Sequence, residues 1–286
     1  SVVTLTRDLA MQQATTADRE IAAGNYRGTL HGIPWGAKDV IAKRGYRTTW
    51  GSEAYRNQVL DLDATVVSRL EQAGAVLIAK LATGEIARGD RWLGRQTRNP
   101  WKTDEGSGGS SAGPGSATAA GLVGFAIGTD TSGSILGPSR TCGVSGLRPT
   151  FGRVSRHGVM PVCWSLDKVG PMCRSVEDCA VVFEAIRGPD NRDLAVVDMP
   201  FNWNGNGGID GLRFAYLQEA FGDAAEPNDQ ATLAALRDLG VELKPVQLPQ
   251  HAGMDALQML LVDEAAAFDE LVISGRVDLL IQDREE

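Results

Sequence analysis

The chain has 286 residues, of which 43% are hydrophobic, and a formal net charge of −8 at pH 7. Such a chain can bury a large core, and its length lies near the upper limit for a single domain. The negative net charge argues against a nucleic-acid-binding role for this chain alone, because binding to a phosphate backbone needs a basic surface. The longest apolar stretch, residues 117–127, contains two glycines and is far shorter than the ~20 residues that span a bilayer. We therefore expect a globular protein that binds neither nucleic acid nor a membrane.

Apolar periodicity in the N-terminal half predicts alternating helices and strands. An amphipathic helix is expected over residues 3–23, and Asp63 is expected to cap a second helix. Residues 76–79 are typical of a short buried strand. A third helix is predicted over residues 113–120, followed by a strand over residues 124–128.

The C-terminal half continues the alternation. Ser175, followed three residues later by Asp178, predicts a capping box for a helix that ends before Gly188. The elements expected after it are strands over 212–217 and 241–246, a helix between them over 229–239 and a final helix over 255–274. Residues 201–208 predict a surface loop rather than a domain boundary. The order predicts a single α/β domain with a central mixed, mostly parallel sheet between helical layers, and a site at the strand ends.

Cysteine usage indicates the compartment. The four cysteines have no metal-ligand spacing; they are Cys142, Cys163, Cys173 and Cys179. In a chain of this length they are typical of buried thiols in a reducing compartment. The first residues do not resemble a signal peptide. We therefore expect a cytoplasmic location.

Two turns of small residues are candidate binding loops. Residues 106–116 consist of Gly, Ser, Ala and Pro, and residues 129–134 form a second small turn directly after an apolar stretch. Bare N–H groups in such turns can approach an anion, either a phosphate or an oxyanion. Neither the P-loop pattern nor the dinucleotide-binding pattern is present. A plain flexible loop is the other interpretation, and the second turn and an upstream lysine weaken it.

The upstream lysine is Lys38, which follows an apolar stretch, residues 30–37, bent by two glycines and a proline. By itself a lysine is most often an exposed side chain without a chemical role. It acts as a base only when neutral, and burial lowers its pKa because desolvation disfavours the ammonium. The apolar neighbours Ile33, Trp35 and Val40 suit such burial.

Other catalytic arrangements fit the sequence less well. A Ser-His-Asp triad has only three histidines to draw on, and His157 lies in a turn where a structural role is favoured. Ser165 and Lys168 match the Ser-x-x-Lys pattern of β-lactamases, but the companion motifs are missing and we treat the match as a coincidence. Cys142 has no adjacent histidine and is expected to be a packing residue. The histidines have no metal-ligand spacing, so we predict neither a metal nor a cofactor.

With Lys38, the Gly-Gly-Ser-Ser run that ends at Ser111, and Ser134 within Gly-Thr-Asp-Thr-Ser-Gly-Ser-Ile, the chain resembles the amidase signature family of Ser-Ser-Lys amide hydrolases. The likeness continues in family order through residues 138–155 and 165–171. It implies the same α/β architecture and assigns three roles: Ser134 is the nucleophile, Ser110 the bridging serine and Lys38 the base.

The resemblance also implies a cis peptide at Gly109–Ser110 and an oxyanion hole. The negative oxygen that develops during attack would be held by the backbone N–H groups of Thr131, Ser132, Gly133 and Ser134. Since these donors belong to the backbone, small side chains suffice there. A serine attacks an amide only when a base removes its proton, so we expect an alkaline optimum, with Lys38 deprotonated.

The second turn departs from the family pattern at two positions. Ser132 stands where the family has the first of two glycines, and a positive φ there would strain it. Leu136 stands where an arginine normally follows. This removes a bidentate anchor, which Arg140 is expected to replace in part. The segment 80–85 lacks the usual Asn and Met and is expected to line the substrate pocket.

The resemblance implies an amidase that cleaves a small-molecule carboxamide through an acyl-serine intermediate, alone or as a homodimer. The runner-up is the A-type subunit of a tRNA-dependent amidotransferase, which releases ammonia from glutamine for its partner. The third hypothesis is an inactive binding protein of the same fold, suggested by Ser132 and Leu136. Family members generally continue beyond Glu286, so we expect one amidase signature domain over residues 1–286 that lacks part of its C-terminal region.

Overall fold

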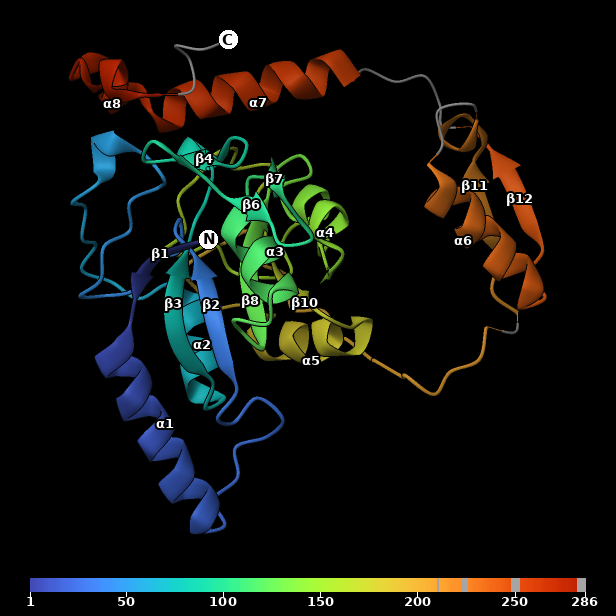
Figure 1. Ribbon diagram of the computed structural model, residues 1–286, viewed down its shortest axis with the longest axis horizontal. Coiled ribbons are helices and arrows are strands. Elements are labelled where there is room, and N and C mark those ends of the chain that lie inside the picture. Colours follow the sequence, from blue (N-terminus) through green and yellow to red (C-terminus); the bar gives the residue numbers. More distant parts are fainter. Residues whose placement is uncertain (210, 223–225, 248–252, 282–286) are drawn as a thin grey trace. The chain divides into compact units, whose positions relative to one another are not determined.

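The structure is a computed structural model that describes residues 1–209, 211–222, 226–247 and 253–281. The chain divides into two compact units, of which the first comprises Ser1–Phe201 with Gln258–Glu286 and the second Asn202–Leu257. The first unit contains the main sheet and every candidate residue named above, so it is the part that positions the site (Figure 1).

The first unit consists of short strands and helices, with four consecutive strands between residues 91 and 106 (Figure 1). Its strands are β1 (Val2–Leu5), β2 (Pro34–Lys38), β3 (Val76–Leu81), β4 (Arg91–Trp92), β5 (Arg95–Gln96), β6 (Arg98–Asn99), β7 (Lys102–Gly106), β8 (Phe125–Asp130), β9 (Ser145–Gly146) and β10 (Lys168–Cys173). Its helices are α1 (Arg7–Ala22), α2 (Thr65–Gln72), α3 (Ala112–Ala119), α4 (Leu136–Cys142), α5 (Val176–Ile186) and α8 (Asp269–Ile273). Helix α7 (Gly253–Ala267) belongs to this unit from Gln258 on. Single 3₁₀ turns lie at Glu53–Tyr55, Glu85–Ala87 and Arg276–Leu279.

The main sheet has six strands in the order β1-β3-β2-β8-β10-β9. β2 pairs in parallel with both β3 and β8, whereas β1, β10 and β9 join antiparallel to their neighbours. Parallel pairing is therefore confined to the centre of a mixed sheet. Because the carboxyl ends of β2 and β8 meet at one edge, their last residues, Lys38 and Asp130, end at the same edge.

Helices cover both faces of this sheet. Leu70 of α2 and Phe183 of α5 join Ile127 of β8 in the larger hydrophobic core. Ala117 of α3 joins Ala126 of β8 in a smaller cluster. Consecutive strand residues point to opposite faces, so α3 packs on the face opposite to α2 and α5. The predicted α/β class, with a mixed sheet between helical layers, is confirmed. The sheet is not mostly parallel as predicted, because only the two pairings of β2 are parallel.

The second unit is small. Its strands β11 (Phe214–Leu217) and β12 (Leu243–Val246) pair in parallel, with helix α6 (Pro227–Asp238) between them in the chain and a 3₁₀ turn at Gln218–Phe221. Glu226 caps α6 in a capping box with Asp229. These elements match the strands and helix predicted from the sequence.

Several local predictions need correction. The helix predicted from residue 3 begins only at Arg7, because β1 pairs antiparallel with β3 at the edge of the sheet. Asp63 does not cap α2: its carboxylate binds Lys43 Nζ at 3.0 Å and accepts the Arg44 N–H at 2.7 Å. The final long helix is interrupted at Phe268, between α7 and α8. The Ser175 cap is confirmed, with its side chain accepting the Asp178 N–H at 3.0 Å.

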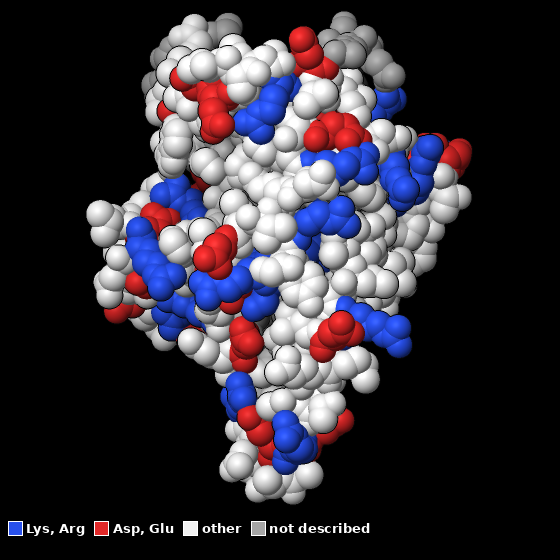
Figure 2. Space-filling view, turned by 90° about the vertical axis from the view of Figure 1, so that its left-hand side faces the viewer, with Lys and Arg blue, Asp and Glu red and all other residues white. Residues whose placement is uncertain are grey.

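The molecular surface carries mixed charge. On the face drawn in Figure 2, basic and acidic side chains are interspersed rather than gathered by sign. All four cysteines are buried free thiols. Among the helices of the described segments, none is long and apolar enough to cross a membrane. The expected cytoplasmic location stays a prediction.

A buried ion pair joins the end of β2 to β3. Lys80 and Asp39 are both fully buried, with Lys80 Nζ 2.7 Å from Asp39 Oδ1 and 3.0 Å from Thr48 Oγ1. The second carboxylate oxygen of Asp39 accepts the Thr49 N–H at 3.0 Å. Both charged groups therefore have hydrogen-bond partners, and each ion neutralises the buried charge of the other.

We predict that Asp39→Asn lowers the free energy of unfolding by about 3 to 5 kcal/mol, because it leaves the Lys80 ammonium buried without an anion. The matched control is Asp61→Asn, whose partner Arg44 is 65% exposed, and this change should cost less than about 1 kcal/mol. Urea unfolding followed by circular dichroism measures both. Equal small losses in the two variants would contradict the role of the buried pair.

Candidate active site

Lys38 and Ser110 meet where β2 ends and α3 begins. Lys38 is the last residue of β2 and is fully buried. Ser110 lies just before Ser111, the N-cap of α3, and that helix packs on β2 and β8. Lys38 Nζ is 2.8 Å from Ser110 Oγ. The packing of one helix on the sheet thus brings a buried amine and a buried hydroxyl within hydrogen-bond distance.

The backbone that presents Ser110 is tightly enclosed. The Gly109–Ser110 peptide bond is cis, as the resemblance implies. A Cβ on Gly109 would lie 1.7 Å from the carbonyl oxygen of Gly89, so a larger residue would require the backbone at Gly89 to move. The carbonyl of Ser110 accepts the Gly84 N–H at 3.1 Å. The segment 80–85 therefore passes beside the Ser110 turn, with its side chains buried.

The environment of Lys38 lowers the pKa of its amine from 10.5 to about 7. The first cause is burial, which removes the water that would solvate the ammonium. The negative charges of Asp130 and Asp167 act in the opposite direction and raise this pKa. A substantial fraction of Lys38 is therefore neutral near pH 7, as a base requires.

A buried carboxylate organises the turn that follows β8. Asp130 Oδ1 accepts the Gly133 N–H at 2.8 Å, and Oδ2 accepts the Ile135 N–H at 2.7 Å. The positive φ of the turn, 128°, falls on Gly133 and not on Ser132. The serine that departs from the family pattern is therefore in a conformation open to any residue. Its side chain is exposed.

Ser111 ties the two small-residue turns together. Its backbone N–H donates to the carbonyl of Ser134 at 3.1 Å, and its hydroxyl donates to the carbonyl of Thr129 at 3.0 Å. The turns that carry Ser110 and Ser134 are thus adjacent. In the described part of the chain no hydrogen bond to the Ser134 hydroxyl is found, so the Lys38 to Ser110 contact is present and a Ser110 to Ser134 hydrogen bond is not.

Thr129 is a partner of the amine that sequence reasoning missed. Lys38 Nζ donates to Thr129 Oγ1 at 2.8 Å and to its carbonyl oxygen at 3.4 Å. A neutral amine has two N–H donors and one lone pair. With both donors directed at Thr129, the lone pair is left to face Ser110. The position of Thr129 within the conspicuous Gly-Thr-Asp motif was the available signal.

The cations that face Asp130 come from outside the turn. Leu136 is exposed, and so is Arg140, which was expected to replace the missing arginine. Instead, Arg148 Nη1 lies 3.7 Å and Lys168 Nζ 4.0 Å from Asp130 Oδ1. Both belong to segments that follow α4, so pairing with Asp130 depends on the tertiary fold rather than on a neighbouring helical turn.

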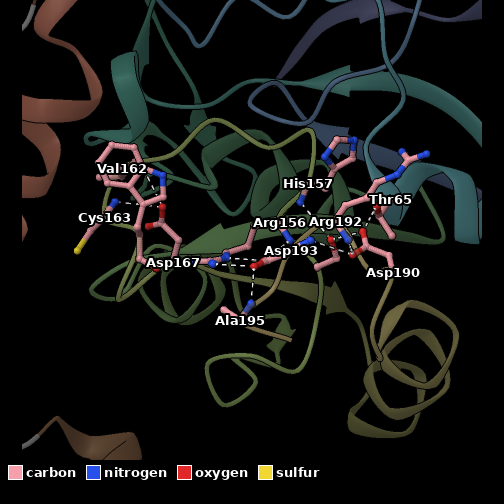
Figure 3. Close-up of polar contacts among 12 residues, drawn as sticks. Thr65, Arg156, His157, Val162, Cys163, Asp167, Asp190, Arg192, Asp193 and Ala195 are labelled. Atoms are coloured by element: carbon pink, nitrogen blue, oxygen red, sulfur yellow. Dashed lines mark hydrogen bonds and ion pairs between the residues drawn. The ribbon is translucent and has the colours of Figure 1, made fainter. Parts of the chain in front are cut away.

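A cavity of about 210 Å³ adjoins this region. Its wall includes Thr129, Thr131 and Asp167, together with apolar side chains such as Met160 and Val162. Figure 3 shows the polar contacts that shape it: Asp167 accepts the N–H groups of Val162 and Cys163 at 2.8 and 3.0 Å. A second contact pairs Arg156 with Asp193 at 2.7 Å. Among the charged groups in the wall, Arg156 and Asp193 thus form an ion pair, whereas Asp167 is held by backbone N–H groups.

The alternative nucleophiles have structural surroundings. Cys142 is fully buried, and burial raises the pKa of its thiol to about 11, which disfavours the reactive thiolate. The Ser165 hydroxyl forms hydrogen bonds with Cys163 and Asp263 rather than with Lys168. His157 lines the cavity wall, and its backbone N–H donates to Ser155 Oγ. Within the described segments no three His, Cys, Asp or Glu side chains gather to hold a metal ion.

The family model described as Amidase matches residues 1–280. The A-type subunit of glutamyl-tRNA(Gln) amidotransferase from Roseiflexus sp. (strain RS-1) is 42% identical over 257 residues, which are 86% of this chain and 53% of the relative. The structure of the peptide amidase from Stenotrophomonas maltophilia is similar with a TM-score of 0.83 at 37% identity, covering 96% of this chain and 60% of that chain. For the A-type amidotransferase subunit from Thermotoga maritima the TM-score is 0.79 at 30% identity, over 94% and 66% of the two chains.

The chain therefore belongs to the amidase family, as the motifs around Lys38, Ser110 and Ser134 indicate. It also has the fold of the solved amidase structures. The chain spans about half the length of the curated relatives it matches.

The lowered pKa of Lys38 predicts a pH dependence of stability. Between about pH 7 and 10.5 the unfolded chain holds the Lys38 proton and the folded protein does not. The free energy of unfolding should therefore rise with pH by about 1.4 kcal/mol per pH unit from this group, and Lys38→Met should remove that rise. Urea unfolding at pH 7.5, 8.5 and 9.5 measures the difference between the two proteins. The exposed Lys102→Met is the control, and a difference for Lys38→Met that stays constant with pH would contradict the lowered pKa.

Proposed function

We propose that this protein hydrolyses the C–N bond of a carboxamide, with Ser134 as nucleophile, Ser110 as bridging serine and Lys38 as base. The observation that carries the proposal is the fully buried Lys38 amine, 2.8 Å from Ser110 Oγ, with its pKa lowered to about 7. Membership of the amidase family supports the same chemistry.

The reaction begins with neutral Lys38, which takes the Ser110 proton while Ser110 takes the Ser134 proton. Ser134 Oγ forms a bond to the amide carbon, and the carbonyl oxygen becomes an oxyanion. Collapse of this intermediate breaks the C–N bond, and the proton returns through Ser110 to the leaving nitrogen, which departs as ammonia or an amine. Water then cleaves the acyl-Ser134 ester by the same proton route and releases the acid. The relay requires the Ser134 hydroxyl to come within hydrogen-bond distance of Ser110 Oγ.

Backbone donors of the turn stabilise the oxyanion in this proposal. The N–H of Gly133 donates to Asp130, so the donors we assign are the N–H groups of Thr131 and Ser132, with Ser134 completing the set. For the Ser132 N–H, no acceptor is found within the described residues. Thr129 supports the base, since it binds the two N–H donors of the neutral amine.

A fluorophosphonate probe tests the proposal. Attack by Ser134 Oγ forms a bond to phosphorus and expels fluoride, so the probe should label Ser134 in the native chain. Ser134→Ala should abolish the labelling, and Lys38→Ala should slow it about 100-fold or more, because the relay loses its base. Mass spectrometry of the labelled peptide locates the site and its rate of formation.

The matched control for this labelling is Ser165→Ala, which removes the serine of the coincidental Ser-x-x-Lys match and should leave labelling intact. Labelling that survives Ser134→Ala would reject the proposal.

A second candidate function is that of an A-type amidotransferase subunit, and the favouring observation is the 42% identity to a relative of that name. Such a protein would release ammonia from glutamine for its partner. By contrast, a free amidase would act on simple amides alone or as a homodimer. In both cases the substrate is a small amide, and we propose no direct contact of this chain with nucleic acid or a membrane.

Ammonia release separates the two functions. We expect the chain alone to hydrolyse simple amides such as propionamide and a peptide amide. Glutaminase activity that rises about tenfold or more on adding a B-type subunit, with simple amides left intact, would instead select the amidotransferase. The control is the Ser134→Ala chain, which should release no ammonia under either condition.

The third hypothesis, an inactive binding protein, loses much of its support. It was suggested by Ser132 and Leu136, yet Ser132 does not have a positive φ and Asp130 has two other cations beside it. We further propose that both compact units belong to one amidase signature domain, residues 1–286, because the family match extends across the two.

A further inference from the structure

Lys168 contacts the backbone of the nucleophile turn. It is the first residue of β10, and its side chain is only 12% exposed. Its Nζ donates to the carbonyl oxygen of Thr131 at 2.8 Å. The residue before it, Asp167, accepts the Thr131 hydroxyl at 2.7 Å and belongs to the cavity wall. Figure 3 shows the Asp167 side chain beside Val162 and Cys163. Two consecutive residues thus hold Thr131 at its carbonyl and at its side chain.

The bond to the Thr131 carbonyl also fixes the direction of the next N–H. The Thr131–Ser132 peptide is trans, so its C=O and N–H point in opposite directions from one rigid plane. With the carbonyl held by Lys168, the Ser132 N–H points away from Lys168. The far end of the turn is anchored separately, because Asp130 accepts the N–H groups of Gly133 and Ile135. The Thr131–Ser132 peptide is therefore held on one side by Lys168 and on the other, through the rest of the turn, by Asp130.

We propose that Lys168 is a positioning residue for the oxyanion hole: its ammonium holds and polarises the Thr131–Ser132 peptide, whose N–H stabilises the oxyanion. This rests on the proposed amide hydrolysis. A cation bound to the carbonyl draws electron density from the peptide and strengthens its N–H as a donor, since hydrogen bonds in series reinforce one another. The contacts with Lys168 and Asp130 also keep the donor in place before the charge develops.

The contacts of Lys168 favour this role over a plain ion pair. Its Nζ is 4.0 Å from Asp130 Oδ1, at the limit of an ion pair, but 2.8 Å from the Thr131 carbonyl. It makes no hydrogen bond with Ser165 in the described chain, so the Ser-x-x-Lys match has no part in it. The short contact of Lys168 is thus with the Thr131 carbonyl, which belongs to the same peptide as the proposed oxyanion donor, the Ser132 N–H.

The protonation of Lys168 is set by several neighbours. Burial lowers its pKa below the ordinary 10.5, and Arg148, in the segment after β9, lowers it further. The charges of Asp130 on β8 and Asp167 oppose this, as does the Cys163 thiol of the preceding loop. Lys168 therefore loses its proton at a lower pH than an exposed lysine does. The same ammonium that polarises the peptide is lost at alkaline pH.

The test measures the rate of Ser134 labelling by a fluorophosphonate from pH 6 to 10.5 in the wild-type chain, Lys168→Met and Lys168→Arg. The wild-type rate should rise through about pH 7 as Lys38 loses its proton and fall again in the alkaline range as Lys168 does. Lys168→Met should be about 10- to 100-fold slower, because the donor is no longer held. In Lys168→Arg the alkaline fall should move to higher pH, since a guanidinium keeps its proton.

Lys43→Met is the matched control, because Lys43 is 10% exposed and paired with Asp63 away from the site. A rate for Lys168→Met equal to that of Lys43→Met would overturn the inference. So would an alkaline fall that is unchanged in Lys168→Arg, a readout that does not depend on Lys168→Met folding. If the wild-type chain is not labelled at Ser134, the proposed function itself fails; if it is labelled and the Lys168 variants behave as wild type, only the role of Lys168 fails.

Discussion

The amine of Lys38 is fully buried and therefore lacks the water that solvates an exposed ammonium. The proposed chemistry of the site depends on this desolvation. An exposed lysine is an ammonium near pH 7 and has no lone pair to offer. Full burial lowers the pKa of Lys38 so that amine and ammonium are both populated near pH 7, while Asp130 and Asp167 keep this pKa from falling further. The pKa of the base thus results from two opposing effects, the loss of hydration and the charges of two carboxylates. The same two carboxylates also bind the neighbouring turn.

Close backbone approach is the second constraint on the site. Gly109 leaves no room for a Cβ beside Gly89, and a Cβ on Gly128 would lie 2.8 Å from Ser111 Oγ. Gly109 thus lets the Ser110 turn approach the backbone at Gly89, and Gly128 lets the end of β8 approach Ser111. Ser111 then bonds across the gap to Thr129 and Ser134. Glycine at positions 109 and 128 is therefore required by the packing, whereas Gly133 has open space around it and is favoured there by its positive φ.

The sequence predicts the regular parts of this structure better than the parts that depend on long-range contacts. α3, β8 and α5 have local signals and lie within a few residues of their predicted bounds. β2 and β10 were not predicted as strands, because Pro34 and Pro171 with neighbouring glycines look like turn residues. Ala37 and Val169 are nevertheless buried in the core, since both strands are held by the tertiary fold. The predicted helix over residues 3–23 likewise includes most of β1. Four residues at a sheet edge are too few to show the alternation of apolar and polar residues that is typical of a strand.

The same distinction explains the site. Lys38, Ser110 and Ser134 are visible as motifs, whereas the partners that fix them are visible only in space. Asp130 holds two N–H groups of the turn, and Arg148 and Lys168 reach it from distant segments. Because the turn is held through its backbone, the side chains at 132 and 136 are free to vary: Ser132 and Leu136 are both exposed. A departure from the family motif at these positions therefore changes the surface of the turn and leaves its hydrogen-bonded frame intact.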